Sequence, residues 1–289
     1  MVITAHYSNY IYEFSGNSIW NLFNKLGRYG VSLFFLVSGF GLVHSIKGKK
    51  LDYQFLLRRI KHLYFPFILI QLLALIYIGI PDNPLSVKSW FYYFIGVDYW
   101  YILVIFFLYC GFYISMKYFK RYQEIILFLY VSVLNIILAL AGCEEWWYLT
   151  NYVFCLGVFL ANHEEDCKVN TLFLAALLFC GFIVSSLIYS KISETFPHDL
   201  FKIMAAMCFA GCVWFLYASI PLRIHLKPID HIGKCSLYVY VLHIQMLAIV
   251  RKYNITSYII LILSIIAVLL VSILLEKIVT NLISGGNGR

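Results

Sequence analysis

A lone histidine close to the start of the chain, His6, is the first side chain suited to proton chemistry, and it lies in the apolar segment MVITAHY. A histidine with its usual pKa of about 6.5 can take a proton from a weak nucleophile, such as a hydroxyl group, at neutral pH. Glu13 is the nearest acid and could orient the ring. We therefore predict that His6 acts as a general base. The alternative is that it lies at a membrane boundary and meets only water or a backbone carbonyl.

A basic segment further along the chain contains Arg58, Arg59, Lys61 and His62 ahead of Pro66. Arginine side chains present paired N–H donors that match phosphate oxygens. A helix that begins near this segment would add partial positive charge at its N-terminus. We predict that Arg58, Arg59 and His62 bind a ligand that carries phosphate groups. Alternatively, these basic residues only mark the cytoplasmic end of a membrane span.

Two further candidates are polar residues inside apolar runs. His243 lies in SLYVYVLH together with Tyr240. An ionisable group within a membrane span is a functional candidate by default, although a structural histidine with satisfied hydrogen bonds fits the same pattern. Ser38 stands beside Gly39 in GVSLFFLVSGF. Small residues there favour close helix packing, and the glycines lack the spacing and the preceding strand of a phosphate-binding loop.

The composition of the chain predicts that membrane helices position these residues. Of its 289 residues 62% are hydrophobic and 12% are charged, and the mean hydropathy is +0.83, whereas about 25% charged residues is typical of a soluble domain. Because a helical span needs about 20 mostly apolar residues, we predict an all-α polytopic membrane helix bundle with about ten transmembrane helices. Residues 1–7 are interpreted as the last third of a truncated first helix, or else as a disordered terminus. The other spans are predicted at residues 30–46, 63–80, 99–117, 125–142, 146–162, 171–190, 201–220, 235–250 and 256–280.

The lysines and arginines between the spans predict the orientation of the bundle. They are concentrated between Lys47 and Lys61, and most of the 22 fall on the same side when the spans alternate. Positive charge in short loops marks the cytoplasmic side. We therefore expect a multi-pass protein of the cell membrane, either a bacterial inner membrane or a plasma membrane. Arg58 and Arg59 then face the cytoplasm, and His6 falls toward the outer face.

Composition also argues against several other classes of protein. The net charge of +8 comes from basic residues scattered along loop edges, which suits anionic lipid head groups rather than nucleic acid. The eight cysteines show no CxxC pair and no mixed Cys/His spacing, so we expect neither a disulfide framework nor a metal site. Polar stretches are too short for a soluble domain, so residues 1–289 are predicted to form a single integral-membrane domain. Aromatic residues at span ends, such as Trp100, suit membrane anchoring and would also stack on a sugar.

Three motifs follow one another in the first part of the chain. They are a first-helix histidine at His6, the second-helix segment GVSLFFLVSGF at residues 30–40, and an arginine segment running into proline, RRIKHLYFP, at residues 58–66. In this order they resemble the motifs of the acyltransferase-3 family, which comprises integral-membrane O-acyltransferases of sugars and surface polysaccharides. Weaker similarity extends to Trp100-Tyr101, to Phe154 and Gly157, and to Gly233, Ser236, Tyr240 and His243. The resemblance covers most of the chain, and the specific motifs lie in its first 66 residues.

The resemblance implies a membrane O-acyltransferase, most simply an O-acetyltransferase. Such an enzyme would move an acyl group from cytosolic acyl-CoA to a hydroxyl of a cell-surface or lipid-linked glycan. His6 occupies the position of the family's inferred catalytic residue, and Arg58, Arg59 and His62 would bind the donor, acetyl-CoA. The residues implied to line the substrate cavity are Ser38, Trp100, Tyr240 and His243. The implied partners are acyl-CoA, the glycan acceptor and membrane lipid, without nucleic acid.

One departure from the family pattern concerns the donor site. Aligned with the usual K-R-x-x-R-L-x-P-P, Arg59 takes the place of the first arginine, but His62 takes that of the second. Donor binding is then weaker, or Arg58 substitutes. Two alternatives to the enzyme remain open: an inactive family member, and a multi-pass transporter or flippase of lipid-linked sugars. The scarcity of charged residues within the spans disfavours the transporter.

Overall fold

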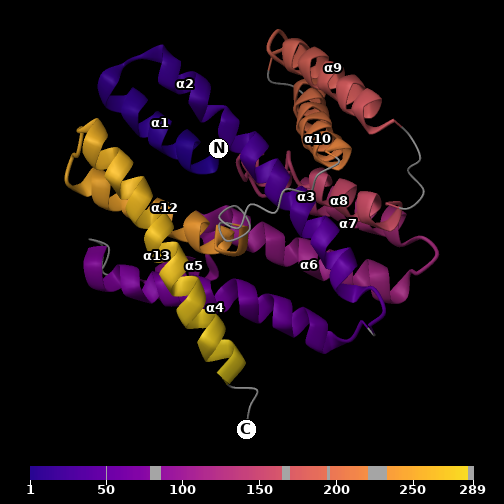
Figure 1. The fold of residues 1–289 in the computed structure, drawn as a ribbon, viewed down its shortest axis with the longest axis horizontal. Coiled ribbons are helices and arrows are strands. Elements are labelled where there is room, and N and C mark those ends of the chain that lie inside the picture. Colours follow the sequence, from indigo (N-terminus) through magenta and orange to yellow (C-terminus); the bar gives the residue numbers. More distant parts are fainter. Residues whose placement is uncertain (50, 79–85, 165–169, 194–195, 221–232, 286–289) are drawn as a thin grey trace. The chain divides into compact units, whose positions relative to one another are not determined.

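All the regular structure in the described part of the chain is helical (Figure 1). The computed structural model describes residues 1–49, 51–78, 86–164, 170–193, 196–220 and 233–285. The helices are, in chain order, α1 (Val2–Ser15), α2 (Ser18–Asn24), α3 (Leu26–Ile46), α4 (Tyr53–Ile78), α5 (Val87–Ile95), α6 (Trp100–Tyr118), α7 (Gln123–Leu140), α8 (Tyr152–Asn162), α9 (Thr171–Tyr189), α10 (Phe196–Ser219), α12 (Ser236–Lys252) and α13 (Tyr258–Gly285). Two 3-10 helical turns, η1 (Val97–Tyr99) and η2 (Glu145–Trp147), precede α6 and α8.

Many of these helices have the length and surface of membrane spans. Within the described ranges, 7 helical stretches are long and apolar enough to cross a membrane: Ser18–Ile46, Tyr53–Ile76, Trp100–Tyr118, Gln123–Leu140, Thr171–Tyr189, Pro197–Ser219 and Tyr258–Asn281. On α9, Leu172, Phe173 and Leu177 are more than half exposed, a surface suited to lipid and not to water. The predicted polytopic helical bundle is confirmed. The count of ten spans stays a prediction, because α1, α8 and α12 are 14, 11 and 17 residues long.

The chain divides into two compact units. Unit 1 comprises Met1–Gly27, Arg58–Leu103 and Ile224–Arg289, and unit 2 comprises Arg28–Leu57 and Val104–Arg223. The prediction of a single domain over residues 1–289 stays a prediction.

In unit 2, α3 and α8 approach each other backbone to backbone. A Cβ atom added to Gly39 would lie 2.3 Å from the carbonyl oxygen of Phe154, and one added to Gly157 would lie 2.1 Å from the carbonyl oxygen of Leu36. No side chain fits at such distances, so both positions require glycine. The two glycines belong to the motifs GVSLFFLVSGF and NYVFCLGVFL. Close packing therefore accounts for the small residues in these segments.

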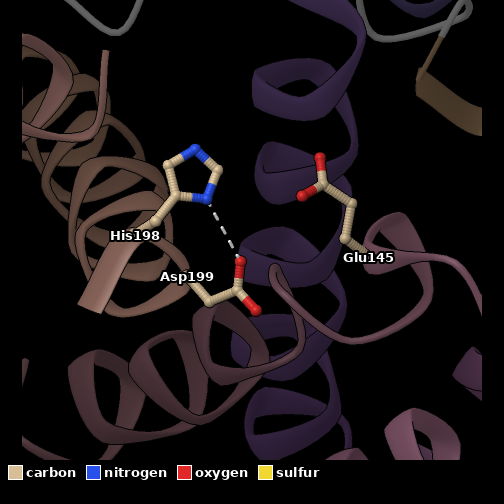
Figure 2. A group of neighbouring side chains, drawn as sticks. All are labelled: Glu145, His198 and Asp199. Carbon is tan, nitrogen blue, oxygen red and sulfur yellow. Dashed lines mark ion pairs between the residues drawn. The ribbon is translucent and has the colours of Figure 1, made fainter. Parts of the chain in front are cut away.

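A cluster of charged side chains around η2 forms a second set of contacts within unit 2. Glu145 forms an ion pair with Arg28 at 3.0 Å and another with Lys202 of α10. Lys202 is only 6% exposed, so its ammonium group depends on the carboxylate of Glu145 for charge compensation. The first turn of α10 adds His198 and Asp199, whose Nδ1 and Oδ1 atoms are 3.5 Å apart (Figure 2).

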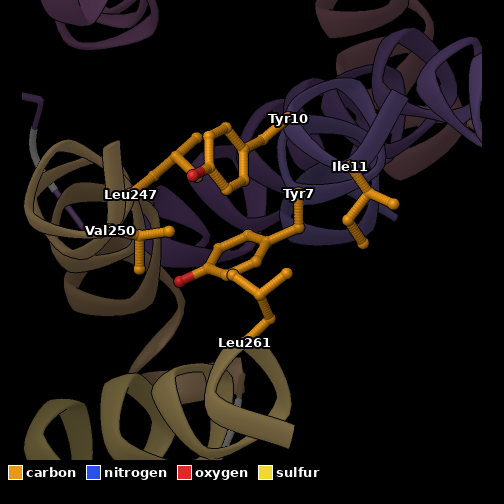
Figure 3. Close-up of a cluster of buried hydrophobic side chains, with 6 residues drawn as sticks. All are labelled: Tyr7, Tyr10, Ile11, Leu247, Val250 and Leu261. Carbon is orange, nitrogen blue, oxygen red and sulfur yellow. The ribbon is translucent and has the colours of Figure 1, made fainter. Parts of the chain in front are cut away.

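In unit 1, α1 packs against α12 and α13 through buried apolar side chains (Figure 3). This cluster consists of Tyr7, Tyr10 and Ile11 of α1, Leu247 and Val250 of α12, and Leu261 of α13. Both tyrosines also form hydrogen bonds. The hydroxyl oxygen of Tyr7 lies 3.0 Å from Oγ of Ser264, and the hydroxyl of Tyr10 donates to the carbonyl of Ile255 over 3.0 Å. Apolar contact and two satisfied hydroxyl groups thus hold α1 against α12 and α13.

Helix α1 is longer than the sequence analysis predicts. It continues past residue 7 to Ser15, and its polar residues do not end it because they bond within the helix. The hydroxyl of Ser8 donates to the carbonyl of Ala5 over 2.9 Å, and the amide of Asn9 donates to Glu13, also over 2.9 Å. The helix ends at Gly16, which has a φ of 65°. His6 therefore lies in the second turn of α1 and not at its C-terminal end.

Helix α4 also differs from its prediction, because it begins at Tyr53 and not at residue 63. The carboxylate of Asp52 accepts a hydrogen bond from the N–H of Phe55 at 2.9 Å and caps the first turn. Arg58 and Arg59 consequently lie in the second turn. The charge of a helix N-terminus is felt mainly within the first turn. The expected contribution of the helix N-terminus to the arginine site is therefore wrong.

Replacing either contact glycine with alanine should weaken unit 2. Because the new methyl group overlaps a backbone carbonyl, Gly39→Ala and Gly157→Ala should each lower stability by roughly 1–3 kcal/mol. Gly41→Ala is the matched control, since nothing lies within 4 Å of a Cβ atom there. Unfolding midpoints of the purified protein in detergent measure the effect. Equal midpoints for Gly39→Ala and Gly41→Ala would contradict the proposed close packing.

Removing the carboxylate of Glu145 should also destabilise unit 2. Glu145→Ala leaves the buried Lys202 without its partner, which typically costs about 3–5 kcal/mol. The matched control is Glu13→Ala, which removes one side of an ion pair with Arg251 whose side chains are 48% and 47% exposed and should cost less than about 1 kcal/mol. The same unfolding assay compares the two. Adding Lys202→Leu to Glu145→Ala should restore most of the loss, and a further loss would argue against this account.

Candidate active site

Two histidines from opposite ends of the sequence face each other in unit 1. The ring centroids of His6 on α1 and His243 on α12 are 5.2 Å apart, with the rings tilted by 48°. His6 is exposed, whereas His243 is fully buried. The helices that carry them are the ones joined by the cluster in Figure 3. The pair therefore combines one exposed histidine with a second that solvent does not reach.

The hydrogen bonds of His243 determine which of its nitrogens carries the proton. Nδ1 lies 3.0 Å from the carbonyl oxygen of Val239. Because a carbonyl can only accept, Nδ1 must donate, and in the neutral ring Nε2 is then an acceptor. Nε2 is buried and has no hydrogen-bond partner in the described part of the chain. A buried acceptor without a donor is uncommon and calls for an explanation.

A row of aromatic rings continues from the histidine pair. Tyr240 lies 5.7 Å from His243 between ring centroids, Tyr101 lies 5.0 Å from Tyr240, and Trp100 lies 6.3 Å from Tyr101. Trp100 is half-buried, and the two tyrosines are buried. Unit 1 thus brings together four of the predicted site residues, His6, His243, Tyr240 and Trp100. Tyr101 joins them as the neighbour of Trp100 in the chain.

The histidine pair lies about two turns from Glu13 and Arg251, near the C-terminal ends of α1 and α12. Glu13 and Arg251 form an exposed ion pair at 2.9 Å. His6 precedes Glu13 by seven residues and His243 precedes Arg251 by eight, which corresponds to roughly 10–12 Å along each helix. Glu13 bonds to Asn9 and Arg251. The suggested orientation of His6 by Glu13 therefore has no support, and in the described part of the chain no hydrogen bond holds the ring of His6.

A relay of hydrogen bonds joins α4, α5 and α12 close to His243. The side-chain amide of Gln71, fully buried, donates to the carbonyl of Tyr93 over 3.3 Å. Its Oε1 atom accepts from Nε2 of Gln245, which also donates to the hydroxyl oxygen of Tyr99. The sequence analysis missed both glutamines. Both could have been recognised as polar uncharged residues in apolar runs, because such side chains form hydrogen bonds between membrane helices.

The basic residues of α4 share one surface of that helix. Arg58 and Arg59 precede His62 by four and three residues, spacings that make them neighbours on a helix. Arg58 and His62 are exposed, and Arg59 is half-buried. Gln71, which contacts α12, follows Arg59 by twelve residues, or about 18 Å along the helix. The basic surface and the histidine pair thus belong to the same unit.

Ser38, the remaining predicted cavity residue, lies in unit 2 on α3. It is half-buried and directly precedes Gly39, the residue that contacts the backbone of α8. It is therefore not among the residues that unit 1 brings together, and its predicted role stays a prediction.

The charged cluster of unit 2 also has the spacing of a metal site. The ligand atoms of Glu145, His198 and Asp199 lie within 4.8 Å of one another. However, Oε1 of Glu145 bonds to Arg28 and Oε2 bonds to Lys202. A metal ion would have to bind beside two positive charges that already occupy this carboxylate. The arrangement is better explained as a network of ion pairs.

Comparison with known proteins identifies a family that covers almost the whole chain. The family model of the acyltransferase-3 family, described as an acyltransferase domain, matches residues 1–277 of the 289. Neither curated proteins nor solved structures give a match. The matched range includes every predicted site residue from His6 to His243. With its long apolar helices, this chain therefore belongs to the acyltransferase-3 family and is a multi-pass membrane acyltransferase.

Proposed function

We propose that the protein is an O-acetyltransferase that moves an acetyl group from acetyl-CoA to a hydroxyl of a cell-surface or lipid-linked glycan. The observation that carries the proposal is that the ring of His6, an exposed residue, packs against the buried ring of His243. The same unit contains the basic surface of α4. A general base and a surface for phosphate groups are what transfer from a CoA thioester to a hydroxyl requires.

In the proposed reaction, His6 removes the proton of the acceptor hydroxyl while the oxygen of this hydroxyl attacks the carbonyl carbon of the thioester. The C–O bond forms, the C–S bond breaks, and the imidazolium returns the proton to the departing sulfur of CoA. His6 is then neutral again and ready for the next cycle. His6 is an exposed residue, and the proposal requires both substrates to approach its ring.

His243 acts in this proposal as a positioning residue. Its Nδ1–H bonds to Val239, which leaves Nε2 as an acceptor beside His6. An acceptor there can take an N–H of His6 and so direct the other nitrogen of His6 toward the hydroxyl. This role would supply a partner for a buried nitrogen that has none in the described structure. Trp100, half-buried in the aromatic row, offers a surface on which a sugar ring can stack.

The donor site follows from the positions along α4. Arg58, Arg59 and His62 would hold the phosphate groups of CoA, and the pantetheine arm would extend toward the level of Gln71, about 18 Å further along the helix. His62 replaces an arginine of the family pattern and supplies one donor or two, against five in a guanidinium group. The proposed site therefore depends mainly on Arg58 and Arg59.

Replacing the proposed base should abolish transfer. A positioned general base contributes roughly 10²–10⁴-fold to a rate, so His6→Ala should reduce the acetyl content of surface glycan at least about a hundredfold in a deletion strain that expresses the variant. Thr4→Ala, an exposed position on the same helix, is the control and should leave acetylation intact. Normal acetylation in His6→Ala cells with normal protein levels would rule out His6 as the base.

The positioning role of His243 has its own measurement. His243→Gln keeps a polar side chain and should lower kcat with little change in the KM for acetyl-CoA, because only the orientation of His6 is affected. A change in KM alone would contradict this role.

Loss of Arg59 should weaken donor binding. A hydrogen bond to a charged group contributes about 1.5–3 kcal/mol, so Arg59→Ala should bind CoA at least about tenfold more weakly by calorimetry in detergent. Lys61→Ala, an exposed residue between Arg59 and His62, should have a much smaller effect. His62→Arg should bind CoA as tightly as the wild type or more tightly. Equal affinities of the wild type and Arg59→Ala would refute the donor site.

A further inference from the structure

A cavity of about 260 Å³ lies in unit 1 between α4, α12 and α13. Its lining includes Ile70 and Ala74 of α4, Leu242 and Met246 of α12, and Val268 and Val271 of α13. Gln245 is the one polar side chain among the lining residues that the structure describes. The cavity is therefore apolar except at a single point.

The hydrogen bonds of the glutamine relay determine which atom of Gln245 remains free to bind a ligand. Because the carbonyl of Tyr93 accepts, Nε2 of Gln71 must donate to it, and Oε1 of Gln71 must be the acceptor for its other partner. Gln245 therefore meets Gln71 through Nε2. The second hydrogen of this amide goes to Tyr99. The hydrogen-bonding capacity that remains is that of Oε1, an acceptor with no donor in the described structure.

In a membrane, the apolar lining alone cannot select a ligand. Lipid tails are as apolar as the side chains of Leu242 or Val268, so a hydrocarbon chain gains little by leaving the bilayer for the cavity. A free hydrogen-bond acceptor in such surroundings can select a ligand, because an O–H or N–H donor finds few partners among lipid tails and gains a hydrogen bond in the cavity. The cavity thus favours a chain that carries a hydrogen-bond donor at the level of Gln245.

The cavity lies next to the histidine pair and opens toward the lipid side of the helices. Leu242 directly precedes His243, and Met246 follows it by three residues on the same side of α12. At the rim, Leu73 of α4 and Val271 of α13 are 37% and 42% exposed. A chain that enters from the bilayer would leave its head group beside the candidate active site.

We propose that this cavity binds the hydrocarbon chain of a lipid-anchored acceptor, with a hydroxyl or amide N–H at the head of the chain donating to Oε1 of Gln245. The inference rests on the proposed function and narrows its acceptor to the lipid-linked class. It also assigns Gln245 a role in recognition that is separate from proton transfer by His6.

The test uses the full-length protein in phosphatidylcholine nanodiscs and a dodecyl glycoside that carries a diazirine in its alkyl chain. After irradiation, mass spectrometry locates the cross-links. We expect them on the cavity faces of α4, α12 and α13, about tenfold more abundant than with the same probe after methylation of its hydroxyls. A diazirine phosphatidylcholine that labels the cavity equally well would overturn the proposal, because the cavity would then hold only bulk lipid.

Three variants and one control complete the test. Val268→Trp fills the cavity. Leu73→Trp closes its rim, where a partly exposed position accommodates a larger side chain more easily. Each variant should lose most of the cross-links. Gln245→Leu should keep the labelling but lose the preference for free hydroxyls. Ile262→Trp, at an exposed site on α13, should label like the wild type. Labelling that is unchanged in both Val268→Trp and Leu73→Trp would refute the site.

The labelling needs no acyl-CoA, so its outcome does not depend on the proposed chemistry. If the wild type transfers no acetyl group, the proposed function fails while the cross-links still report on the cavity. If the wild type is active, transfer can be compared between the dodecyl glycoside and a methyl glycoside of the same sugar, which has no long chain. Leu73→Trp should lower transfer to the dodecyl glycoside more than transfer to the methyl glycoside. Equal effects on the two acceptors would overturn this inference and leave the proposed function standing.

Discussion

Helices surrounded by lipid gain little from hiding apolar side chains against one another, so close packing and buried hydrogen bonds have to hold this protein together. Unit 2 uses the backbone contacts of Gly39 and Gly157, where a single methyl group would overlap a carbonyl. Unit 1 uses the hydroxyl groups of Tyr7 and Tyr10, which bond across to α13 and to the loop before it. The same rule explains the buried Gln71, because every polar group inside the bundle needs a partner.

Against this background, two polar atoms of α12 that have no hydrogen-bond partner in the described part of the chain acquire significance. Nε2 of His243 is buried beside an accessible imidazole, and Oε1 of Gln245 is left as an acceptor at an apolar cavity. Both atoms lie on α12, within three residues of each other. In our proposals, Nε2 of His243 accepts from His6, and Oε1 of Gln245 accepts from a substrate. They account for why α12 combines a histidine and a glutamine in an otherwise apolar run.

The largest differences between prediction and structure concern where helices begin and end. Ser8 and Asn9 looked like the end of a span, but their side chains bond within α1 and let it continue. The basic residues before Pro66 looked like a loop, but Asp52 caps a helix that already contains them. The predicted span limits followed hydropathy, which indicates the part of a helix that lies in the membrane and not where the helix begins and ends. Capping and local hydrogen bonds set the actual limits of a helix.

The sequence by itself determined the membrane class, because so few charged residues cannot cover a soluble surface. It also identified His6 and His243, which stand out in apolar runs, and Arg59, which belongs to a basic segment ahead of Pro66. Tertiary structure alone decided that His6 meets His243, because these residues are separated by most of the chain and no local pattern encodes their contact. It likewise decided the orientation of Gln245, which depends on a carbonyl of α5 acting through Gln71.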